Sequence, residues 1–332
     1  MLRFVLHAGH HDTLAPYARR WAGELGRRIE IVSYDELFRA TRVPRCVHVF
    51  ADSERLNDGD RELAAQVWES IRRGAPDLKL MNHPLRSMCR YELLRTLHET
   101  GVNRFDVYRL TEARKPARFP VFLRGENDHA GPETGLIESQ VELDAVVEAL
   151  VRDGKSRGSR LVTEFCAERN DDGLYRKYGA FYIDGEVLPR HAMQSREWVV
   201  KADTRILNDA QWAEERRYLE LNPHADWIRR VFEIARIDYG RIDYGVVDGL
   251  PQAYEINTNP TIIPAENSKL SPSGERFTAE FALALERLEA TALAPRNWSD
   301  CVRLDRPIKS WPLRLSNTLL AKTLGAQVRR AI

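Results

Sequence analysis

The sequence predicts an α/β protein with additional α+β lobes, and three observations support this prediction. Residues 1–83 alternate short apolar runs with amphipathic helical segments, which is typical of a parallel sheet covered by helices. Residues 160–257 contain two β-rich segments that each turn at an Asp-Gly pair, which is typical of antiparallel hairpins. The length of 332 residues allows two domains or two to three packed lobes.

The N-terminal elements follow from the spacing of apolar residues. The run at residues 2–7 predicts a first strand rather than a signal peptide. Residues 11–25 place apolar side chains at helical spacing up to Gly26, and a second helix is predicted at residues 60–74. Further strands are predicted at residues 29–33, 46–50 and 78–81.

The rest of the chain mixes helices with β-rich runs. Helices are predicted at residues 87–98 and from Ser139, whose spacing to Glu142 fits a capping box. The strand at residues 119–125 leads into a polar, glycine-containing loop at residues 126–135. The remaining predicted elements are a strand at 160–166, hairpins at 180–191 and 242–257, and helices near 227–235 and 276–288.

Composition and charge narrow the class of function. The chain has 50 Lys and Arg against 49 Asp and Glu, and this balance argues against a dedicated nucleic-acid binder. No apolar run approaches the roughly 18 residues that a membrane span needs. The four cysteines lack metal-binding or redox spacing, so a reducing cytoplasm is the expected location.

The most informative segment is residues 240–260, GRIDYGVVDGLPQAYEINTNP, because its hairpin brings oxygen-bearing side chains together. With a turn that spans Asp248 to Leu250, Asp243 lies opposite Glu255, and Asn257 shares the face of Glu255. These oxygens suit Mg²⁺, which takes a few protein ligands together with water and phosphates. Arg241 lies on the same face as Asp243 and is expected to point at the same anionic ligand. A merely solvated charged face is the less favoured alternative, because aromatic and branched residues flank the cluster.

This segment resembles the C-terminal signature of the ATP-grasp superfamily, in particular the D-alanine–D-alanine ligase-like and RimK-like carboxylate–amine ligases. The shared pattern is G-R-I-D, a hairpin, and E-x-N-x-x-P. The resemblance implies the ATP-grasp fold of three lobes. It also implies that the three oxygen-bearing residues bind Mg²⁺ or Mn²⁺ on the ATP phosphates, while Arg241 contacts the transferred phosphoryl group. Thr261 replaces a usual glycine beside the second substrate, which leaves the substrate class open.

The resemblance extends upstream in the same order and implies further ATP contacts. Arg90 and Arg124 stand where the family has phosphate-binding lysines, and arginine can bind phosphate bidentately. Lys177 is the expected phosphate contact on a later strand. Arg190 is assigned to catalysis together with Arg241, near the γ-phosphate or the acceptor. The adenine hinge matches the backbone of Glu164, Phe165 and Cys166.

The loop after the first strand, HAGHHDT, contains three histidines. A metal site there is disfavoured, because only Asp12 is spaced to complete it. In ligases of this superfamily the corresponding loop faces the substrate. The resemblance therefore makes His10 and His11 candidate substrate contacts.

Together these observations predict three regions. Residues 1–83 form an N-terminal α/β lobe, and residues 84–290 form the ATP-grasp region. Within the latter, the lid spans about 105–165 and the C-terminal lobe about 166–290. Residues 291–332 form a basic extension, whose leucines at helical spacing are expected to pack on the body or on a second copy in a homodimer.

The activity implied by the resemblance is ligation driven by ATP and Mg²⁺. A carboxylate is phosphorylated to an acyl phosphate, which an amine then attacks; the substrates are small molecules or peptides. Two alternatives stay open on the sequence alone. One is a kinase of this fold that phosphorylates a hydroxyl, and the other is a nucleotide-binding regulator without catalysis.

Overall fold

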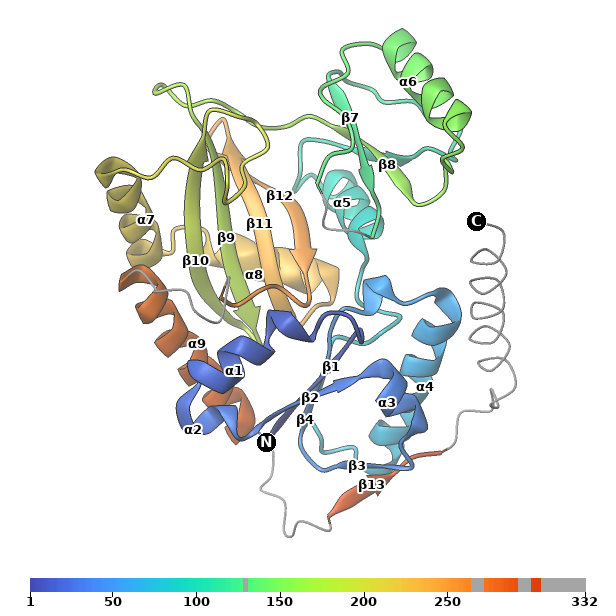
Figure 1. The fold of residues 1–332 in the computed structure, drawn as a ribbon, viewed down its shortest axis with the longest axis vertical. Coiled ribbons are helices and arrows are strands. Elements are labelled where there is room, and N and C mark those ends of the chain that lie inside the picture. The colour runs from blue at the N-terminus through green and yellow to red at the C-terminus, as the bar shows by residue number, and fades with distance from the viewer. Residues whose placement is uncertain (128–130, 264–271, 292–299, 306–332) are drawn as a thin grey trace, which may run out of the picture.

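In a computed structural model of the chain, the described residues are 1–127, 131–263, 272–291 and 300–305. They form two four-stranded sheets, a three-stranded sheet and a two-stranded sheet. Figure 1 shows the parallel four-stranded sheet in the lower part of the view and the antiparallel one at upper left. The three-stranded sheet lies at upper right, so two sheets stand above the N-terminal one.

The N-terminal part contains the parallel sheet that the sequence predicts. Its strand order is β2-β1-β4-β5, and all neighbouring strands run parallel. The strands are β1 (Leu2–Leu6), β2 (Ile29–Ser33), β4 (Val47–Phe50) and β5 (Leu80–Met81). The helical segments here are η1 (His11–Thr13), α1 (Ala15–Arg20), α2 (Gly23–Gly26), α3 (Tyr34–Arg39), η2 (Ser53–Arg55) and α4 (Asp58–Gly74).

The single helix predicted over residues 11–25 is wrong in its extent, because the segment is divided into η1, α1 and α2. Pro16 lies in the first turn of α1, where its missing N–H breaks no helical hydrogen bond. Gly23 has a φ of +55°, a conformation that interrupts a right-handed helix and that glycine adopts without strain. The helix α3 was not predicted, although Ser33 and Glu36 form a complete capping box at its start.

The three-stranded antiparallel sheet has the order β6-β8-β7. Its strands are β6 (Val107–Arg109), β7 (Val121–Gly125) and β8 (Arg160–Glu164), and α6 (Gln140–Arg152) packs on it. The hydroxyl of Ser139 accepts a hydrogen bond from the N–H of Glu142, which confirms the predicted start of α6. The short strand β6 was not predicted from the sequence.

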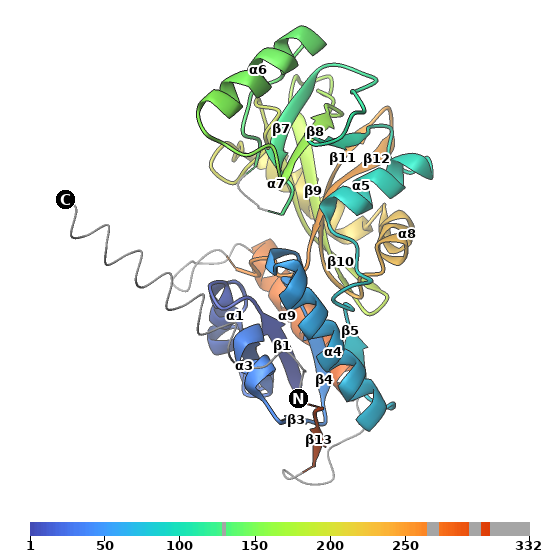
Figure 2. The ribbon, with the colours of Figure 1, turned by 90° about the vertical axis from the view of Figure 1, so that its right-hand side faces the viewer.

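The second four-stranded sheet is antiparallel, with the order β10-β9-β11-β12. Its strands are β9 (Tyr175–Ile183), β10 (Glu186–Ser195), β11 (Tyr239–Val247) and β12 (Leu250–Asn257). Both hairpins turn at their Asp-Gly pairs, and all four turn residues have positive φ, as predicted. The associated helices are α5 (Arg90–Glu99), α7 (Asp209–Leu221) and α8 (Ala225–Ala235). The helix α5 packs against β12, α8 and β6, and so joins two sheets (Figure 2).

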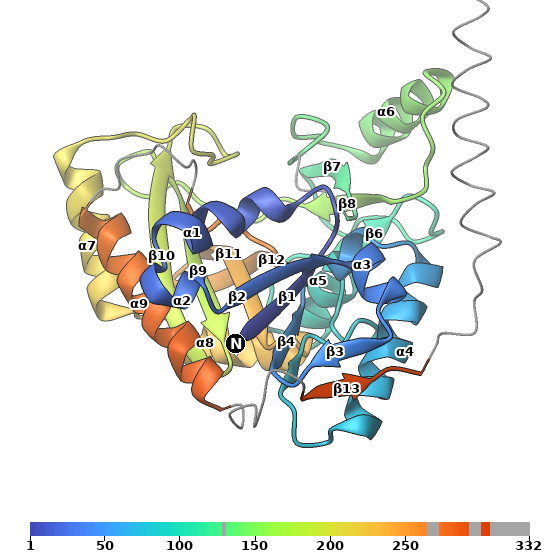
Figure 3. The ribbon, with the colours of Figure 1, turned by 60° about the horizontal axis from the view of Figure 1, so that its bottom comes forward.

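The segments after β12 return to the N-terminal part. Phe277 and Phe281 of α9 (Pro272–Ala290) share one buried cluster with Phe4 of β1, Tyr17 of α1 and Phe181 of β9. The strand β13 (Cys301–Arg303) pairs with β3 (Arg42–Pro44), and Figure 3 shows these two strands side by side. The leucines at helical spacing in the predicted basic extension, at residues 315, 319, 320 and 324, lie outside the described residues.

Two further sequence expectations concern membrane spans and cysteines. Among the helices that the structure describes, none combines the length and apolarity needed to cross a membrane. All four cysteines are free thiols.

We predict that Phe281→Ala destabilises the protein by about 3–5 kcal/mol, because it leaves a large cavity where α9, α1 and β9 meet. The Phe281 ring is fully buried, and its centroid lies 5.1 Å from the rings of both Tyr17 and Phe181. Chemical denaturation measures the change. Leu283→Ala on the same helix is the control, because Leu283 is 51% exposed and should cost under about 0.5 kcal/mol. Equal losses in the two variants would contradict this packing.

Candidate active site

A cavity of about 630 Å³ lies between the three-stranded sheet and the antiparallel four-stranded sheet. Strands β7 to β12 and the segment at residues 198–205 contribute to its lining. It brings together most of the residues that the sequence singled out. These are Arg124, Glu164, Phe165, Cys166, Lys177, Arg190, Arg241, Asp243, Glu255 and Asn257.

Asp243 is held by two cations at the base of this cavity. The β11–β12 register places Asp243 opposite Glu255, as predicted, and Arg241 opposite Asn257. The predicted turn over residues 248–250 is wrong, because Val247 already pairs with Leu250; a β-bulge between Asp243 and Tyr244 supplies the shift instead. Arg241 Nε donates to Asp243 Oδ1 at 2.9 Å, and Lys177 Nζ donates to Oδ2 at 3.3 Å. Burial favours the neutral acid, but the positive charges of Arg241 and Lys177 outweigh it and hold the pKa of Asp243 well below its usual range. Asp243 is therefore an anion.

Glu255 is held by two arginines from other parts of the chain. Arg90 Nη2 donates to Glu255 Oε2 at 2.6 Å, and Arg124 Nη2 donates to the same oxygen at 2.8 Å. Arg90 Nη1 also donates to the backbone oxygens of Gly125 and Glu126, both at 2.9 Å. Because Arg90 opens α5 and Arg124 lies on β7, these contacts fix the three-stranded sheet relative to β12.

These six side chains form a charge cluster, consisting of Arg90, Arg124, Lys177, Arg241, Asp243 and Glu255. Its four cations face two carboxylates, so the cluster carries a net positive charge. Arg90 does not itself line the cavity, whereas the other five members of the cluster do. A cavity wall of this kind attracts a polyanion, since the fields of several fixed cations add in a partly buried site.

The predicted metal ligands meet one chemical requirement of a metal site. Two carboxylates and the amide oxygen of Asn257 are the hard oxygen donors that Mg²⁺ prefers. In the structure these oxygens have other partners: the carboxylates accept from the four cations, and Asn257 Oδ1 accepts from the N–H of Asn259 at 2.8 Å. Within the described ranges, no group of three or more His, Cys, Asp and Glu side chains could hold a metal ion. In this arrangement the three predicted metal ligands therefore bind protein donors.

The other end of the cavity is aromatic. The ring centroid of Trp198 lies 5.0 Å from that of Phe122 and 5.7 Å from that of Phe165. Tyr254 also lines this end and donates its hydroxyl hydrogen to the backbone oxygen of Cys166 at 3.0 Å. The sequence did not single out Trp198, because it lies in a segment without regular secondary structure, where hydrophobic periodicity gives no signal.

In the predicted adenine hinge, one backbone N–H group has no acceptor among the described residues. The N–H of Phe165 donates to the oxygen of Pro120 at 2.9 Å, but among the residues of the described ranges none accepts from the N–H of Cys166. The Cys166 thiol has a raised pKa because it is buried, so it is a poor nucleophile. Cys166 can therefore offer a backbone hydrogen bond to a flat ligand beside the aromatic rings.

The Glu164 side chain has a structural role, whereas the sequence pattern assigned only the backbone of this residue, to the adenine hinge. Its carboxylate accepts from the N–H groups of Asp106, Ala117 and Arg118 and from the hydroxyl of Tyr108, all between 3.0 and 3.2 Å. It thereby fixes the loop between β6 and β7.

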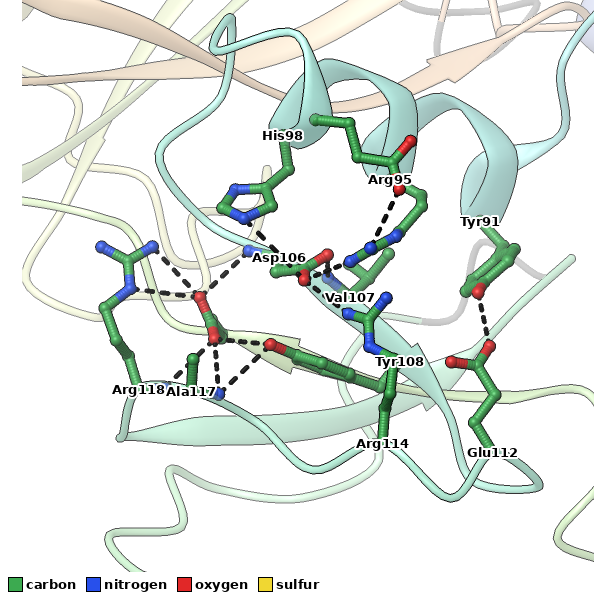
Figure 4. Close-up of polar contacts among 12 residues, drawn as sticks. Tyr91, Arg95, His98, Asp106, Val107, Tyr108, Glu112, Arg114, Ala117 and Arg118 are labelled. Carbon is green, nitrogen blue, oxygen red and sulfur yellow. Dashed lines mark hydrogen bonds and ion pairs between the residues drawn. The ribbon is translucent and has the colours of Figure 1, made fainter.

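Asp106 connects this loop to α5. Its carboxylate accepts from Arg95 and from Arg114, as Figure 4 shows. It also accepts from the N–H of Val107 at 2.8 Å. Because α5 carries Arg90, this network supports the position of the charge cluster.

His10 and His11 do not line the cavity. His10 Nδ1 lies 2.9 Å from Oδ2 of the buried Asp52, and the His10 backbone oxygen accepts from Asn259 at 3.1 Å. Since Asn259 follows β12, His10 lies beside the segment that leaves the cavity wall. Its role as a substrate contact, like that of His11, stays a prediction.

Comparison with known proteins gives the fold. No protein-family model matches the chain, and no curated protein matches it in sequence. D-alanine–D-alanine ligase from Bacillus anthracis matches with a TM-score of 0.50 at 15% identity, covering 88% of this chain and 97% of that one. D-cycloserine synthetase DcsG matches at 0.46 and 18% identity, covering 86% and 99%. The ATP-grasp ligase PsnB, complexed with minimal precursor, matches at 0.46 and 11% identity, also covering 86% and 99%.

The protein therefore has the ATP-grasp fold, as the sequence predicts. At these identities the likeness establishes the fold alone. The chemistry has to be argued from the cavity.

We predict that Asp106→Asn lowers the free energy of unfolding at pH 7 by roughly 3 kcal/mol, because breaking a buried ion pair costs about 3–5 kcal/mol. Burial opposes ionisation of Asp106, but Arg95 and the Val107 N–H outweigh it and lower the pKa of Asp106. A lowered pKa stabilises the fold above the unfolded value, so the difference from wild type should shrink as the pH falls below about 4.

Urea unfolding at pH 7, 5 and 3 tests this prediction. Glu99→Gln is the matched control, since Glu99 pairs with the same Arg95 but is 56% exposed and should contribute less than about 0.5 kcal/mol. A loss for Asp106→Asn that stays constant down to pH 3 would show that its charge is not the stabilising feature.

Proposed function

We propose that this protein is a ligase that uses ATP and Mg²⁺ to join a carboxylate to an amine through an acyl phosphate. The observation that supports this most strongly is the charge cluster, which lies at one end of a cavity whose other end is aromatic. A nucleoside triphosphate has the same division, with a flat base at one end and a polyanion at the other.

The cavity chemistry favours ATP as the phosphoryl donor. The rings of Phe165, Trp198 and Tyr254 offer an apolar slot for adenine, and the Cys166 N–H offers a hydrogen bond to its edge. The triphosphate would then reach the cations of the charge cluster, which bind phosphate through charge-assisted hydrogen bonds. The match to the ATP-grasp sequence pattern supports the same orientation.

Asp243, Glu255 and Asn257 would hold Mg²⁺. The phosphates would draw Arg90 and Arg124 away from Glu255 and leave its carboxylate available. The ion supplies charge neutralisation at the phosphate oxygens. In this account Arg241 has two roles: it orients Asp243 and it can reach a phosphoryl group next to that carboxylate.

The reaction has two balanced steps. A carboxylate oxygen attacks the γ-phosphorus of ATP and displaces ADP, so R–COO⁻ and ATP⁴⁻ give R–CO–OPO₃²⁻ and ADP³⁻. The lone pair of an amine then attacks the acyl carbon, phosphate leaves with the C–O bond electrons, and the proton lost by nitrogen appears on phosphate. The products are an amide and HPO₄²⁻. Arg241 stabilises the charge that develops on the phosphoryl group in the first step.

The fold favours a ligase over the two alternatives of the sequence. One solved structure that shares it is, by its name, a D-alanine–D-alanine ligase. A non-catalytic regulator has no need for the paired Arg241 and Asp243 beside the metal-binding oxygens. A small-molecule or peptide acid and amine are the substrates that a cavity of this size accepts.

We predict that saturating Mg²⁺-ATP raises the unfolding free energy, by about 2.7 kcal/mol at 100 times the dissociation constant. Glu255→Gln should weaken Mg²⁺-ATP but bind metal-free ATP at least as tightly as wild type, because it removes the carboxylate that competes for Arg90 and Arg124. Thermal unfolding with ATP in Mg²⁺ and in EDTA measures both effects.

Two results would count against this arrangement. An unchanged melting temperature of the wild type with Mg²⁺-ATP would rule out the nucleotide site. Equal weakening of both nucleotide forms in Glu255→Gln would rule out competition between Glu255 and the triphosphate.

We predict that Arg241→Ala still folds and binds ATP but loses about 10²–10³ in turnover, the usual cost of removing one preorganised charge from such a site. A screen of ADP release over mixtures of acids and amines identifies a substrate pair, and the variant is then compared with wild type on that pair. Arg229→Ala is the control, because Arg229 pairs with the exposed Asp226 on α8. Turnover of Arg241→Ala within threefold of wild type would refute its assigned role.

A further inference from the structure

The strand β10 contains a β-bulge next to the cavity. Its register with β9 runs from Pro189 opposite Ala180 directly to His191 opposite Gly179, so Arg190 is an extra residue. In a regular strand, neighbouring side chains point to opposite faces, whereas a bulge redirects one of them. Arg190 and His191 consequently both line the cavity, although they are adjacent in sequence.

Arg190 presents a cation without a carboxylate partner. Among the described residues, no Asp or Glu forms an ion pair with it. Its Nη2 lies 3.4 Å from the backbone oxygen of Ile262, and its guanidinium lies 4.6 Å from the ring centroid of Phe277. Burial, and then the positive charge of Arg241, lower the pKa of Arg190 to about 10, so it remains charged at pH 7. A guanidinium in this setting gains most from an anionic ligand.

His191 presents a buried hydrogen-bonding atom beside Arg190. Its Nε2 is inaccessible to solvent and has no hydrogen-bond partner among the described residues. The ring occupies the space that the missing side chain of Gly179 leaves, since a Cβ there would lie 2.5 Å from Cε1 of His191. Burial lowers the pKa of His191 well below its usual range, so the ring is neutral and can donate one hydrogen bond.

The pair lies between the charge cluster and the segment that follows β12. His191, Gly179, Asp243 and Glu255 are successive partners across the four strands of the sheet. Arg190 is close enough to Arg241 for that charge to act on it, and its guanidinium contacts the segment after β12 at Ile262. A group bound by Arg190 and His191 would therefore lie next to the phosphoryl group that Arg241 contacts.

We propose that Arg190 and His191 form the subsite that binds the reacting carboxylate of the acid substrate; this rests on the proposed function. The guanidinium matches a carboxylate bidentately. The neutral imidazole can add a hydrogen bond without further charge through Nδ1, because Nε2 is enclosed against Gly179. The cations of the charge cluster already serve the triphosphate, whereas Arg190 serves no anion of the described chain. The subsite selects an ionised acid over the corresponding amide, because only the acid neutralises Arg190.

Binding of a minimal probe tests the subsite without knowledge of the natural substrate. Acetate and acetamide are titrated into the protein saturated with Mg²⁺ and a non-hydrolysable ATP analogue, and saturation-transfer NMR reports their binding. We expect acetate to bind and acetamide not to. In Arg190→Gln and His191→Gln, the acetate dissociation constant should rise at least tenfold, while that of the nucleotide changes less than twofold. Arg216→Gln, which removes an exposed arginine of α7, should change neither.

A measurement on the wild type complements the variants, should either fail to fold. With ¹⁵N-labelled histidine, acetate should shift the ring signals of His191 but not those of His224, which is hydrogen-bonded to Tyr244 on another face. Acetate binding that is unchanged in both substitutions, or no shift at His191, would overturn the proposal. Inorganic phosphate is titrated in the same way. If the two substitutions abolish phosphate binding but leave acetate binding unchanged, Arg190 and His191 bind the phosphoryl group, and the proposal is overturned.

The same data separate this proposal from the proposed function. If the wild type binds no Mg²⁺-nucleotide, the proposed function fails and the subsite fails with it. If nucleotide binding is normal and acetate binding ignores Arg190 and His191, the subsite alone is wrong.

Discussion

Two carboxylates on one hairpin and four cations from elsewhere in the chain form the interaction on which the rest of the structure depends. A buried carboxylate costs several kcal/mol unless cations compensate it. Glu255 can therefore be partly buried on β12 only if α5 and β7 bring Arg90 and Arg124 to it, and Asp243 can be buried only if Lys177 and Arg241 lie beside it. This requirement fixes the three-stranded sheet over the antiparallel one and creates the charged end of the cavity.

The surrounding structure keeps those charges in place. The aromatic cluster of Phe277 and Phe281 packs α9 against both the N-terminal sheet and β9, the strand that also carries Lys177 to the cavity. The polar network of Asp106 and Glu164 attaches α5 to the loop between β6 and β7. Packing and polar contacts thus act together on one small region. A ligand that replaces the internal ion pairs therefore has cations already positioned to receive it, which reduces the entropic cost of binding.

The hairpins could be predicted because local rules determine them, since an Asp-Gly pair fixes where each chain reverses. The pairing of Asp243 with Glu255 also needs a β-bulge between Asp243 and Tyr244, because the turn alone would place Tyr254 opposite Asp243. Other features depend on tertiary structure. The bulge at Arg190 and the position of Trp198 leave no periodic signal, and β13 forms only because β3 offers it an edge. The pairing of Arg90 with Glu255 joins residues 165 positions apart, so local spacing could not show that the cations hold the carboxylates.

The central claim is that the charge cluster exchanges its internal ion pairs for a metal–nucleotide complex. A crystal structure with a non-hydrolysable ATP analogue and Mn²⁺, located by its anomalous scattering, tests this most directly. The account predicts Mn²⁺ bound to Asp243, Glu255 and Asn257, with Arg90 and Arg124 on phosphate oxygens and no longer on Glu255. Nucleotide bound elsewhere, or bound here with both arginines still on Glu255 and no metal beside it, would contradict the account.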